Sequence, residues 1–331
     1  MKELPAIVAA LLAAPEKGAV LATLVAAEGS SYRRPGARLL LLADGRRVGS
    51  ISGGCLEEDV IARAAAVRAT GQAEAVVYDT SSENDLVWGV GLGCHGVVRV
   101  LIELLAPQPA WAEALARRFE QRRAAELSII HGGEDRSAWG TRLAAPGDCA
   151  DPGRLFAETV APPIALVIFG AGDDAQPLAR LAHELGWRVT VADPRAAFAT
   201  AARFPTAHRL LVGPANELVA QAAPDATTLA VVMTHHYVHD VPLLRDLLAR
   251  PLAYLGLLGP RQRAEKILAD LAADGFTPTP EQRARLHAPV GLDLGADGPE
   301  PVALAILAEM QAALAGRDAR PLRERTRPIH E

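Results

Sequence analysis

One segment of this chain, residues 166–193, limits the fold more than any other, because it combines a strand, a glycine turn, a helix and a second strand. It reads LVIFGAGDDAQPLARLAHELGWRVTVAD. Gly170 permits a tight turn, Gly172 lets the backbone approach a pyrophosphate, and Ala175 takes the place of the third glycine, where helix and strand pack. The segment therefore predicts a Rossmann-type turn.

Asp193 ends the second strand of this segment, about 20 residues beyond the glycines, where an acid binds a ribose diol. Its charge would repel a 2′-phosphate, so the pattern favours NAD over NADP. Asp173 and Asp174 support the alternative of a Rossmann fold without a dinucleotide, because carboxylates beside a pyrophosphate are electrostatically unfavourable. The same carboxylates suit the positive end of a helix dipole.

The order of the expected elements predicts an α/β fold. Strands and helices alternate in the second half, which indicates a C-terminal Rossmann-type parallel sheet domain with crossover helices. The expected strands there are 166–169, 188–192, 227–233 and 254–258, with helices over 176–184, 241–248 and 261–272. A final helix is expected near Gly298, with Asp297 as N-cap and Glu300 as its capping-box partner.

The first half predicts a mixed α/β N-terminal domain. Its expected elements are an amphipathic first helix, a hairpin over 37–51, a helix over 56–69, strands over 73–78 and 97–105, a helix over 111–125, and strands over 127–131 and 140–144. A stretch rich in Pro, Gly and Asp follows at 146–163. The domains are therefore expected to be 1–155 and 156–331.

Charge and cysteine content limit the partners and the compartment. The formal net charge is -5, which argues against nucleic acid as the main partner. The chain has 3 cysteines, a low and odd number that favours a reducing, cytoplasmic compartment over a disulfide scaffold. No stretch approaches the roughly 18 apolar residues of a membrane span, so no membrane is expected.

A histidine cluster follows the apolar strand that ends at residue 233. In a doubly wound sheet the carboxyl ends of the strands line the ligand crevice, which places His235, His239 and Asp240 there. Three interpretations stay open: a zinc or iron site, proton transfer or phosphate contact, and a polar helix start. Arg261 follows a further glycine turn and either binds an anion or is a solvated helix start.

Two glycine loops carry the remaining cysteines of interest. The loop GSISGGC contains Gly53, Gly54 and Cys55 before a helix, where a thiolate is stabilised. The loop GVGLGCHG contains Gly93 and Cys94. The two loops suggest one shared pocket, and the alternative is that both cysteines are small buried residues.

A third polar loop, GSSYRRPG, places Arg33 and Arg34 among glycines and hydroxyls. Adjacent arginines in such a loop can grip an anion. A solvated turn explains the same residues equally well.

Taken together, these stretches resemble the XdhC/CoxI family of accessory factors for molybdenum hydroxylases. The resemblance is carried by GSSYRRPGARLLL, GSISGGCLEEDV, GLGCHG, the segment around the GAG turn, VVMTHHYVHD and YLGLLGPRQR. It spans most of the chain, from about Gly29 to Ala312. Two residues depart from the family pattern: Asp173 stands where a His is expected, and His95 where a Gly is expected.

The resemblance implies a cofactor chaperone rather than a catalyst. Family members bind the molybdenum cofactor (molybdopterin), a pterin phosphate with a dithiolene, hold it during sulfuration by a cysteine desulfurase, and pass it to an apo molybdenum hydroxylase such as a xanthine dehydrogenase. Cys55 and Cys94 then become candidates for contact with the molybdenum. The Rossmann half becomes a candidate for the phosphate or nucleotide end.

Two other functions and one assembly question stay open at this point. The first is an NAD-dependent oxidoreductase, in which His235 or His239 would serve hydride transfer. The second is an interaction module whose sheet has lost its ligand. Whether the chain forms a homodimer is also open.

Overall fold

The computed structural model describes residues 2–13, 18–29, 31–54, 56–79 and 96–326. The chain forms two compact units, Met1–Pro163 and Ile164–Glu331. The division therefore follows Pro163 instead of residue 155, because the strand β8 (Leu155–Val160) pairs with β6 (Ala125–Ile130) of the first unit.

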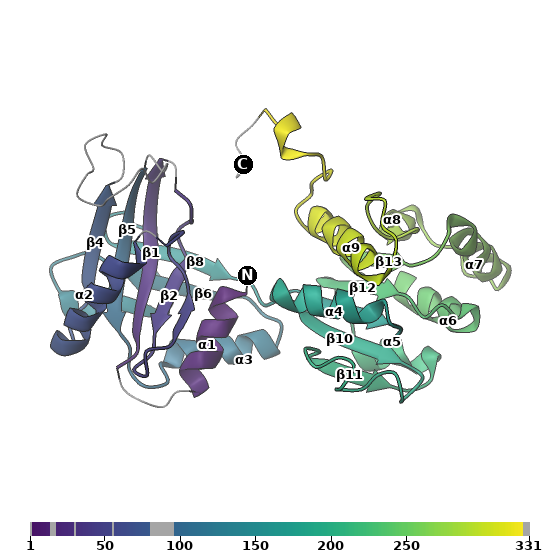
Figure 1. Ribbon diagram of the computed structural model, residues 1–331, viewed down its shortest axis with the longest axis horizontal. Helices are drawn as coiled ribbons and strands as arrows, with labels where there is room; N and C mark the ends of the chain where they lie inside the picture. Colours follow the sequence, from purple (N-terminus) through teal and green to yellow (C-terminus); the bar gives the residue numbers. More distant parts are fainter. Residues whose placement is uncertain (1, 14–17, 30, 55, 80–95, 327–331) are drawn as a thin grey trace. The chain divides into compact units, whose positions relative to one another are not determined.

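The first unit is built around a five-stranded antiparallel sheet in the order β3-β2-β1-β5-β4. Its strands are β1 (Val20–Gly29), β2 (Arg38–Leu41), β3 (Arg47–Gly49), β4 (Glu74–Asp79) and β5 (Gly96–Leu104). The helix α2 (Glu57–Thr70) packs on one face. The other face packs on α1 (Glu3–Ala13), α3 (Ala110–Glu120) and a small sheet in the order β7-β6-β8, with β7 at Gly140–Leu143. Figure 1 shows these elements.

The first helix buries the apolar positions that the sequence predicted to share one face, although most of its outward residues are alanines rather than polar residues. Leu4, Ile7, Val8 and Leu11 are buried at helical spacing and join the core beneath the large sheet. This burial explains the apolar start of the chain by packing within the unit. Among the described residues, no helix has the length and apolar character needed to cross a membrane.

A buried charge pair links the two sheets of the first unit. The Arg38 guanidinium is only 2% exposed and donates to the Glu158 carboxylate of β8 and to the Gly36 carbonyl. Nearby, Glu103 accepts hydrogen bonds from the Thr141 amide (2.9 Å) and hydroxyl (2.6 Å). Burial raises the pKa of Glu103. Buried charged groups are tolerated when they are hydrogen-bonded, as the terminal nitrogens of Arg38 and the carboxylate of Glu103 are here.

The second unit contains a six-stranded parallel sheet in the order β11-β10-β9-β12-β13-β14. The strands are β9 (Ala165–Phe169), β10 (Arg188–Asp193), β11 (Arg209–Val212), β12 (Thr228–Val232), β13 (Tyr254–Leu257) and β14 (Leu286–His287). The predicted α/β fold with a Rossmann-type parallel sheet is confirmed. The strand order reverses direction between β9 and β12, and ligands of such sheets bind at the carboxyl ends of the strands at this switch point.

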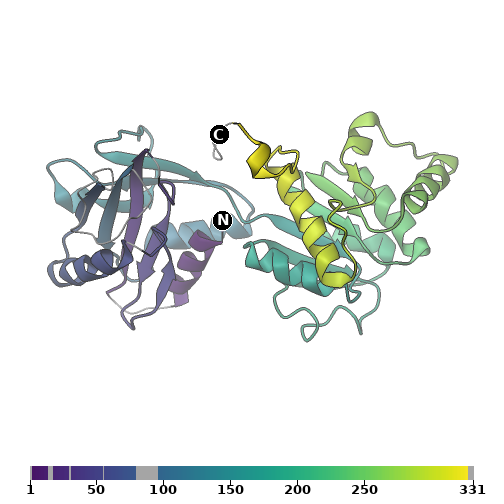
Figure 2. The same ribbon diagram turned by 45° about the horizontal axis from the view of Figure 1, so that its top comes forward.

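Helices cover both faces of the parallel sheet. One face packs on α4 (Ala175–Glu184) and α9 (Pro299–Leu314), which lie beside each other in Figures 1 and 2. The other face packs on α5 (Ala215–Ala222), α6 (Tyr237–Leu248) and α7 (Arg261–Ala273), and the short α8 spans Pro280–Ala284.

The start of α9 corrects one detail of the sequence prediction. Its N-cap is Gly298, and no side chain caps the helix. The expected capping box of Asp297 and Glu300 is therefore wrong. Pro299, with its fixed φ and missing N–H, takes the first helical position and starts the helix instead.

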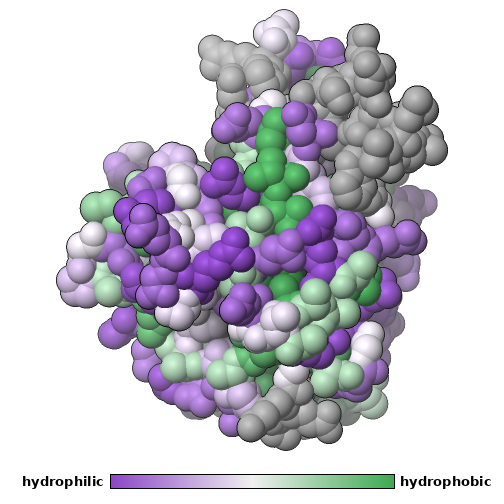
Figure 3. All heavy atoms as spheres, turned by 90° about the vertical axis from the view of Figure 1, so that its left-hand side faces the viewer, coloured by the Kyte–Doolittle hydropathy of each residue, from purple (hydrophilic) through white to green (hydrophobic). Residues whose placement is uncertain are grey.

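The side of the molecule shown in Figure 3 is mostly hydrophilic, with a narrow strip of hydrophobic side chains running through it. Apolar exposure of this extent is ordinary for folded proteins. It identifies no interaction surface by itself.

Candidate functional site

The Ser50–Gly54 loop of the first unit is organised around a carboxylate from α2. Glu57 lies in the first helical turn and accepts hydrogen bonds from the Ser50 hydroxyl and from the Ser52 amide, both at 2.9 Å, and from the Ser52 hydroxyl. The Ser52 hydroxyl oxygen in turn accepts from the amides of Gly54 (3.1 Å) and Leu56 (3.2 Å). The loop conformation is thus set by hydrogen bonds on both sides of residue 55.

A second carboxylate, Glu3 of α1, joins this loop to the arginine loop. Its Oε1 accepts from the Ser50 amide at 2.8 Å, and its Oε2 accepts from the Arg33 guanidinium at 2.5 Å. Two motifs that are separate in the sequence therefore meet at one side chain of the first helix.

Tyr32 completes the contact between the two loops. A Cβ built on Gly53 would lie 3.7 Å from the Tyr32 ring, which places the ring beside the glycine. The Tyr32 side chain is 71% exposed, and Gly53, Gly54 and Arg34 are exposed as well. Arg34 forms no ion pair within the described part of the chain. The two loops together present a surface with an aromatic ring, a guanidinium and open backbone; we call residues 32–34 and 50–54 the loop pair.

The predicted molybdenum contacts lie outside this description. Cys55, Gly93 and Cys94 are not among the described residues, so their expected convergence stays a prediction. Cys149, the remaining cysteine, is exposed.

In the second unit, the predicted glycine turn lies at the switch point of the sheet. Gly170 follows β9 with φ at +115°, and a Cβ on it would lie 2.4 Å from the Met233 carbonyl oxygen. Only glycine fits there, because the turn packs against the end of β12. Gly172 is less constrained, since its Cβ would meet a side-chain atom, Oδ1 of Asp174, at 2.8 Å.

The acid expected to bind ribose has a different set of partners. Asp193 is buried, and its Oδ2 accepts from the Ala171 amide (2.7 Å) and from Nη2 of Arg195 (2.8 Å). Its Oδ1 accepts from the amide (2.8 Å) and Nε (2.9 Å) of Arg195. Burial alone would raise the pKa of Asp193, but these hydrogen bonds outweigh burial and lower it. The expected ribose contact is therefore replaced by contacts within the chain, and the prediction of NAD binding through Asp193 is not supported.

The first histidine of the cluster reaches across to the glycine turn. The ring Nε2 of His235 lies 2.7 Å from Oδ2 of Asp174. The His235 backbone has φ at +59°, an unfavourable value for a residue with a side chain. The other Asp174 oxygen, Oδ1, is buried and has no hydrogen-bond partner in the described residues. The pair covers one side of the turn.

Asp240 and His239 are placed differently from His235. Asp240 is 1% exposed and is held by the Arg263 guanidinium at 2.6 and 2.9 Å and by the Thr234 hydroxyl at 2.5 Å. His239 lies beside His236, with ring centroids 5.5 Å apart. No group of three or more potential metal ligands occurs within the described residues. Asp240 is therefore committed to Arg263, whereas Arg261, at the start of α7, is exposed.

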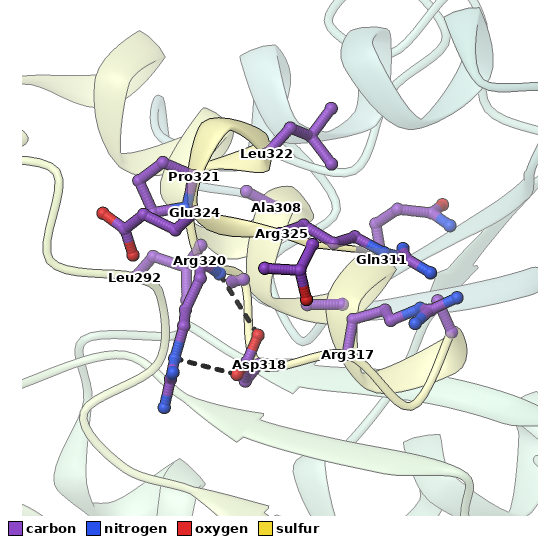
Figure 4. Close-up of a pocket in the computed structure, with 14 residues that line it drawn as sticks. Leu292, Ala308, Gln311, Arg317, Asp318, Arg320, Pro321, Leu322, Glu324 and Arg325 are labelled. Carbon is purple, nitrogen blue, oxygen red and sulfur yellow. Dashed lines mark hydrogen bonds and ion pairs between the residues drawn. The ribbon is translucent and has the colours of Figure 1, made fainter. Parts of the chain in front are cut away.

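A pocket of about 1240 Å³ lies elsewhere in the second unit, between the C-terminal half of α9 and residues 317–326 (Figure 4). Arg320 pairs with Asp318 at 2.9 Å in its wall. None of the predicted site residues lines this pocket.

Comparison with known proteins follows the same division into two units. A model of the XdhC and CoxI family matches residues 12–79, and a model of the XdhC Rossmann domain matches residues 166–310. A Bacillus subtilis (strain 168) protein, named as a probable xanthine dehydrogenase subunit, is 33% identical over 315 residues, which cover 89% of this chain and 93% of that protein. The chain belongs to the XdhC and CoxI family.

Two further relatives of this XdhC/CoxI family member cover most of its length. The molybdenum cofactor insertion chaperone PaoD of Escherichia coli (strain K12) is 27% identical over 303 residues, 89% of this chain and 83% of PaoD. A crystal structure described as a xanthine dehydrogenase from Bacillus halodurans has a TM-score of 0.79 and 30% sequence identity, and the match covers 97% of this chain and 99% of that one.

Several residues that shape both sites of this XdhC/CoxI protein were not identified from its sequence. No role in either loop was predicted for Glu3 or for Glu57. Arg195 lies just after the strand that ends at Asp193, and Arg263 lies just after the second glycine turn. No known motif spacing marks either arginine as a site residue. The sequence did contain a pattern that could have predicted the role of Glu57. An acid in the first turn of a helix that follows a serine-rich loop can accept hydrogen bonds from the loop amides.

Proposed function

We propose that this chain is a maturation factor for a molybdenum hydroxylase of the xanthine dehydrogenase type. It binds the molybdenum cofactor, holds it while a cysteine desulfurase supplies sulfur, and transfers it to the apo-enzyme. The proposal is supported by similarity over 89% of this chain to a protein named as a molybdenum cofactor insertion chaperone. The family models that match both units support the same role.

The observation that carries the proposal is the meeting of the two polar loops at Glu3. The Ser50 amide and the Arg33 guanidinium bind opposite oxygens of this carboxylate. As a result, the exposed Tyr32, Arg34, Gly53 and Gly54 belong to one surface rather than to two unrelated turns.

The chemistry of the loop pair fits the organic part of the cofactor. Arg34, and the part of Arg33 that Glu3 leaves open, supply positive charge for a phosphate. The Tyr32 ring supplies a flat apolar face for a pterin. The Ser52 amide does not contribute, because it already donates to Glu57. When bound, the cofactor supplies the molybdenum–dithiolene centre that the target enzyme needs.

The experiment measures pterin retained by the full chain. The protein is purified after expression in cells that make molybdopterin, and pterin released on denaturation is quantified by fluorescence and mass spectrometry. We expect the wild type to retain pterin and the double variant Tyr32→Ala/Arg34→Ala to retain at least about 30-fold less, the loss expected for one charge-assisted contact and one stacking contact together.

Arg46→Ala is the matched control for this experiment. Arg46 is exposed and pairs with Asp44 in the turn between β2 and β3, at the opposite end of β2 from the arginine loop. Its removal changes the charge equally and should leave pterin retention unchanged. Wild-type protein without pterin above background, or equal retention by the double variant, would contradict the proposal.

A further inference from the structure

Burial of Asp193 changes what the crevice of the second unit presents to a ligand. The preference for NAD over NADP predicted from the sequence assumed an exposed carboxylate at this position. In the structure the Asp193 side chain is 1% exposed, whereas its partner Arg195 is 34% exposed. The exposed charged group beside the end of β10 is therefore the Arg195 guanidinium, a cation, and not the Asp193 carboxylate.

A second arginine lies next to the first. The guanidinium carbons of Arg195 and Arg203 lie 3.8 and 5.2 Å from the centroid of the Phe198 ring. Nη2 of Arg203 also donates to the Ala171 carbonyl at 3.1 Å, which ties this arginine to the glycine turn. The two guanidinium groups and the ring thus form one cluster beside the turn.

Both arginines keep unused hydrogen-bonding capacity. Nη2 of Arg203 makes both hydrogen bonds of that side chain, and no bond from its Nη1 occurs among the described residues. Its Nε is buried and unpartnered there, so the open donor is Nη1. Arg195 donates hydrogen bonds from Nε and Nη2 to Asp193, and no bond from its Nη1 occurs within the described part of the chain. Planar guanidinium groups with free donors are suited to phosphate.

One carboxylate already occupies part of this cluster. Asp173 is 83% exposed and accepts from Nη2 of Arg203 at 2.9 Å. An ion pair as exposed as this one contributes little to stability, so a ligand anion can replace the carboxylate at small cost. Asp174 is the other nearby acid, and its Oδ2 lies against the His235 ring.

We propose that Arg195 and Arg203 bind a phosphate monoester on the ribose of a nucleotide, at the position that the Asp173 carboxylate holds in the free protein. The residues just after the second strand of a Rossmann fold lie at the nucleotide ribose, and an arginine there accommodates a 2′-phosphate. Asp193, neutralised by Arg195, neither repels that phosphate nor accepts the ribose diol. This site is independent of the proposed binding of pterin by the loop pair.

NADPH and NADH are the probes, because they differ by this one phosphate. Both are titrated into the full chain, and nicotinamide fluorescence gives each Kd. We expect NADPH to bind at least about ten-fold more tightly than NADH, the ratio expected for one charge-assisted hydrogen bond. Equal affinity for the two, or no NADPH binding up to about 1 mM, overturns the proposal.

Two variants test the residues from opposite directions. Arg203→Gln should weaken NADPH binding by about ten-fold and leave NADH binding unchanged. Asp173→Asn removes the competing carboxylate without removing a buried group, and should tighten NADPH binding by about two- to five-fold. Weaker NADPH binding by Asp173→Asn overturns the proposal even if Arg203→Gln misfolds.

Arg209→Ala is the charge-matched control. Arg209 is an exposed residue at the first position of β11, away from the carboxyl ends of the strands. Its removal should change neither Kd by more than about two-fold, since exposed charges are screened over about 10 Å. If Arg209→Ala and Arg203→Gln weaken NADPH binding equally, the loss follows from net charge alone, and the proposed phosphate site at Arg195 and Arg203 is overturned.

Discussion

The Glu57 carboxylate accepts hydrogen bonds from both the amide and the hydroxyl of Ser52. The glycine loop of the first unit is therefore folded around this charged side chain of the helix that follows it. Burial alone would raise the pKa of Glu57, but the hydrogen bonds from Ser52 and Ser50 outweigh burial and lower it below its ordinary value of 4.5. The loop and the ionisation of Glu57 are therefore coupled.

Replacing Glu57 with Gln should destabilise the protein in a pH-dependent way. Because the folded state lowers this pKa, the stabilisation is present above pH 4.5 and is lost as the pH falls further. At pH 7 we expect Glu57→Gln to lower the free energy of unfolding by about 2 kcal/mol, with a smaller difference from wild type below pH 4.5.

Urea unfolding at pH 7 and pH 4 measures this difference. Glu58→Gln is the control, because Glu58 is the next residue, carries the same charge and is exposed. Equal effects of the two substitutions would show that the loop does not depend on Glu57.

The two glycines of the Rossmann-type turn should respond differently to alanine. Gly170→Ala places a Cβ 2.4 Å from a backbone oxygen at φ +115°, and should cost about 3 kcal/mol or more. Gly172→Ala meets a side-chain atom, Oδ1 of Asp174, at 2.8 Å, which can shift more readily than backbone, and should cost about 1 kcal/mol. Thermal or urea unfolding compares the variants, and similar losses would refute the difference in packing.

The sequence predicted the parallel sheet well because its strands are buried on both sides. Leu166–Phe169 and Leu229–Val232 are continuous apolar runs, which is the pattern that such strands produce. Three strands were not predicted: β8, β11 and β14, which is only two residues long. The first follows a stretch rich in Pro and Gly, and the second is four residues long with two exposed positions, so neither carries a clear period.

Local motifs were predicted more successfully than the contacts between them. The glycine turn was found because its geometry is encoded within a few residues. The ion pair of Glu3 with Arg33 joins residues 30 positions apart, and no periodic pattern records it. Spacing from the glycine turn predicted where the Asp193 carboxylate lies, and this carboxylate was therefore assigned to a ribose. Spacing does not show which neighbouring group binds that carboxylate.

Arg263 and Arg261 begin the same helix, yet only Arg263 should matter for stability. Arg263 neutralises Asp240, whose side chain is 1% exposed, and removing one partner of a buried pair leaves an unpaired charge. We expect Arg263→Met to lower the free energy of unfolding by about 3 kcal/mol and Arg261→Ala to change it by less than about 0.5 kcal/mol. Urea unfolding of both variants tests the assignment, which fails if Arg261→Ala is the more damaging.

Tyr254 should make the second unit sensitive to alkaline pH. Its ring is 1% exposed and stacks on His287 with centroids 4.2 Å apart, and its hydroxyl donates to Glu309 of α9. Burial and the Glu309 carboxylate raise the pKa of Tyr254 above its ordinary value of 10.0. A raised folded-state pKa gives stability that is complete below pH 10 and is lost as the pH rises beyond it, because the unfolded chain releases its proton first.

The expected result is a stability difference that changes with pH. Tyr254→Phe should cost about 1 to 2 kcal/mol at pH 8, since Glu309 loses a donor, and this cost should shrink above pH 10. Urea unfolding between pH 8 and pH 11 measures it, with Tyr32→Phe as the control because the Tyr32 side chain is 71% exposed. Glu309 also accepts from the Gly291 amide at 2.9 Å and lies 3.3 Å from Nδ1 of His287, so these contacts remain in Tyr254→Phe. A cost that stays constant over this range would mean that the Tyr254 proton is not linked to folding.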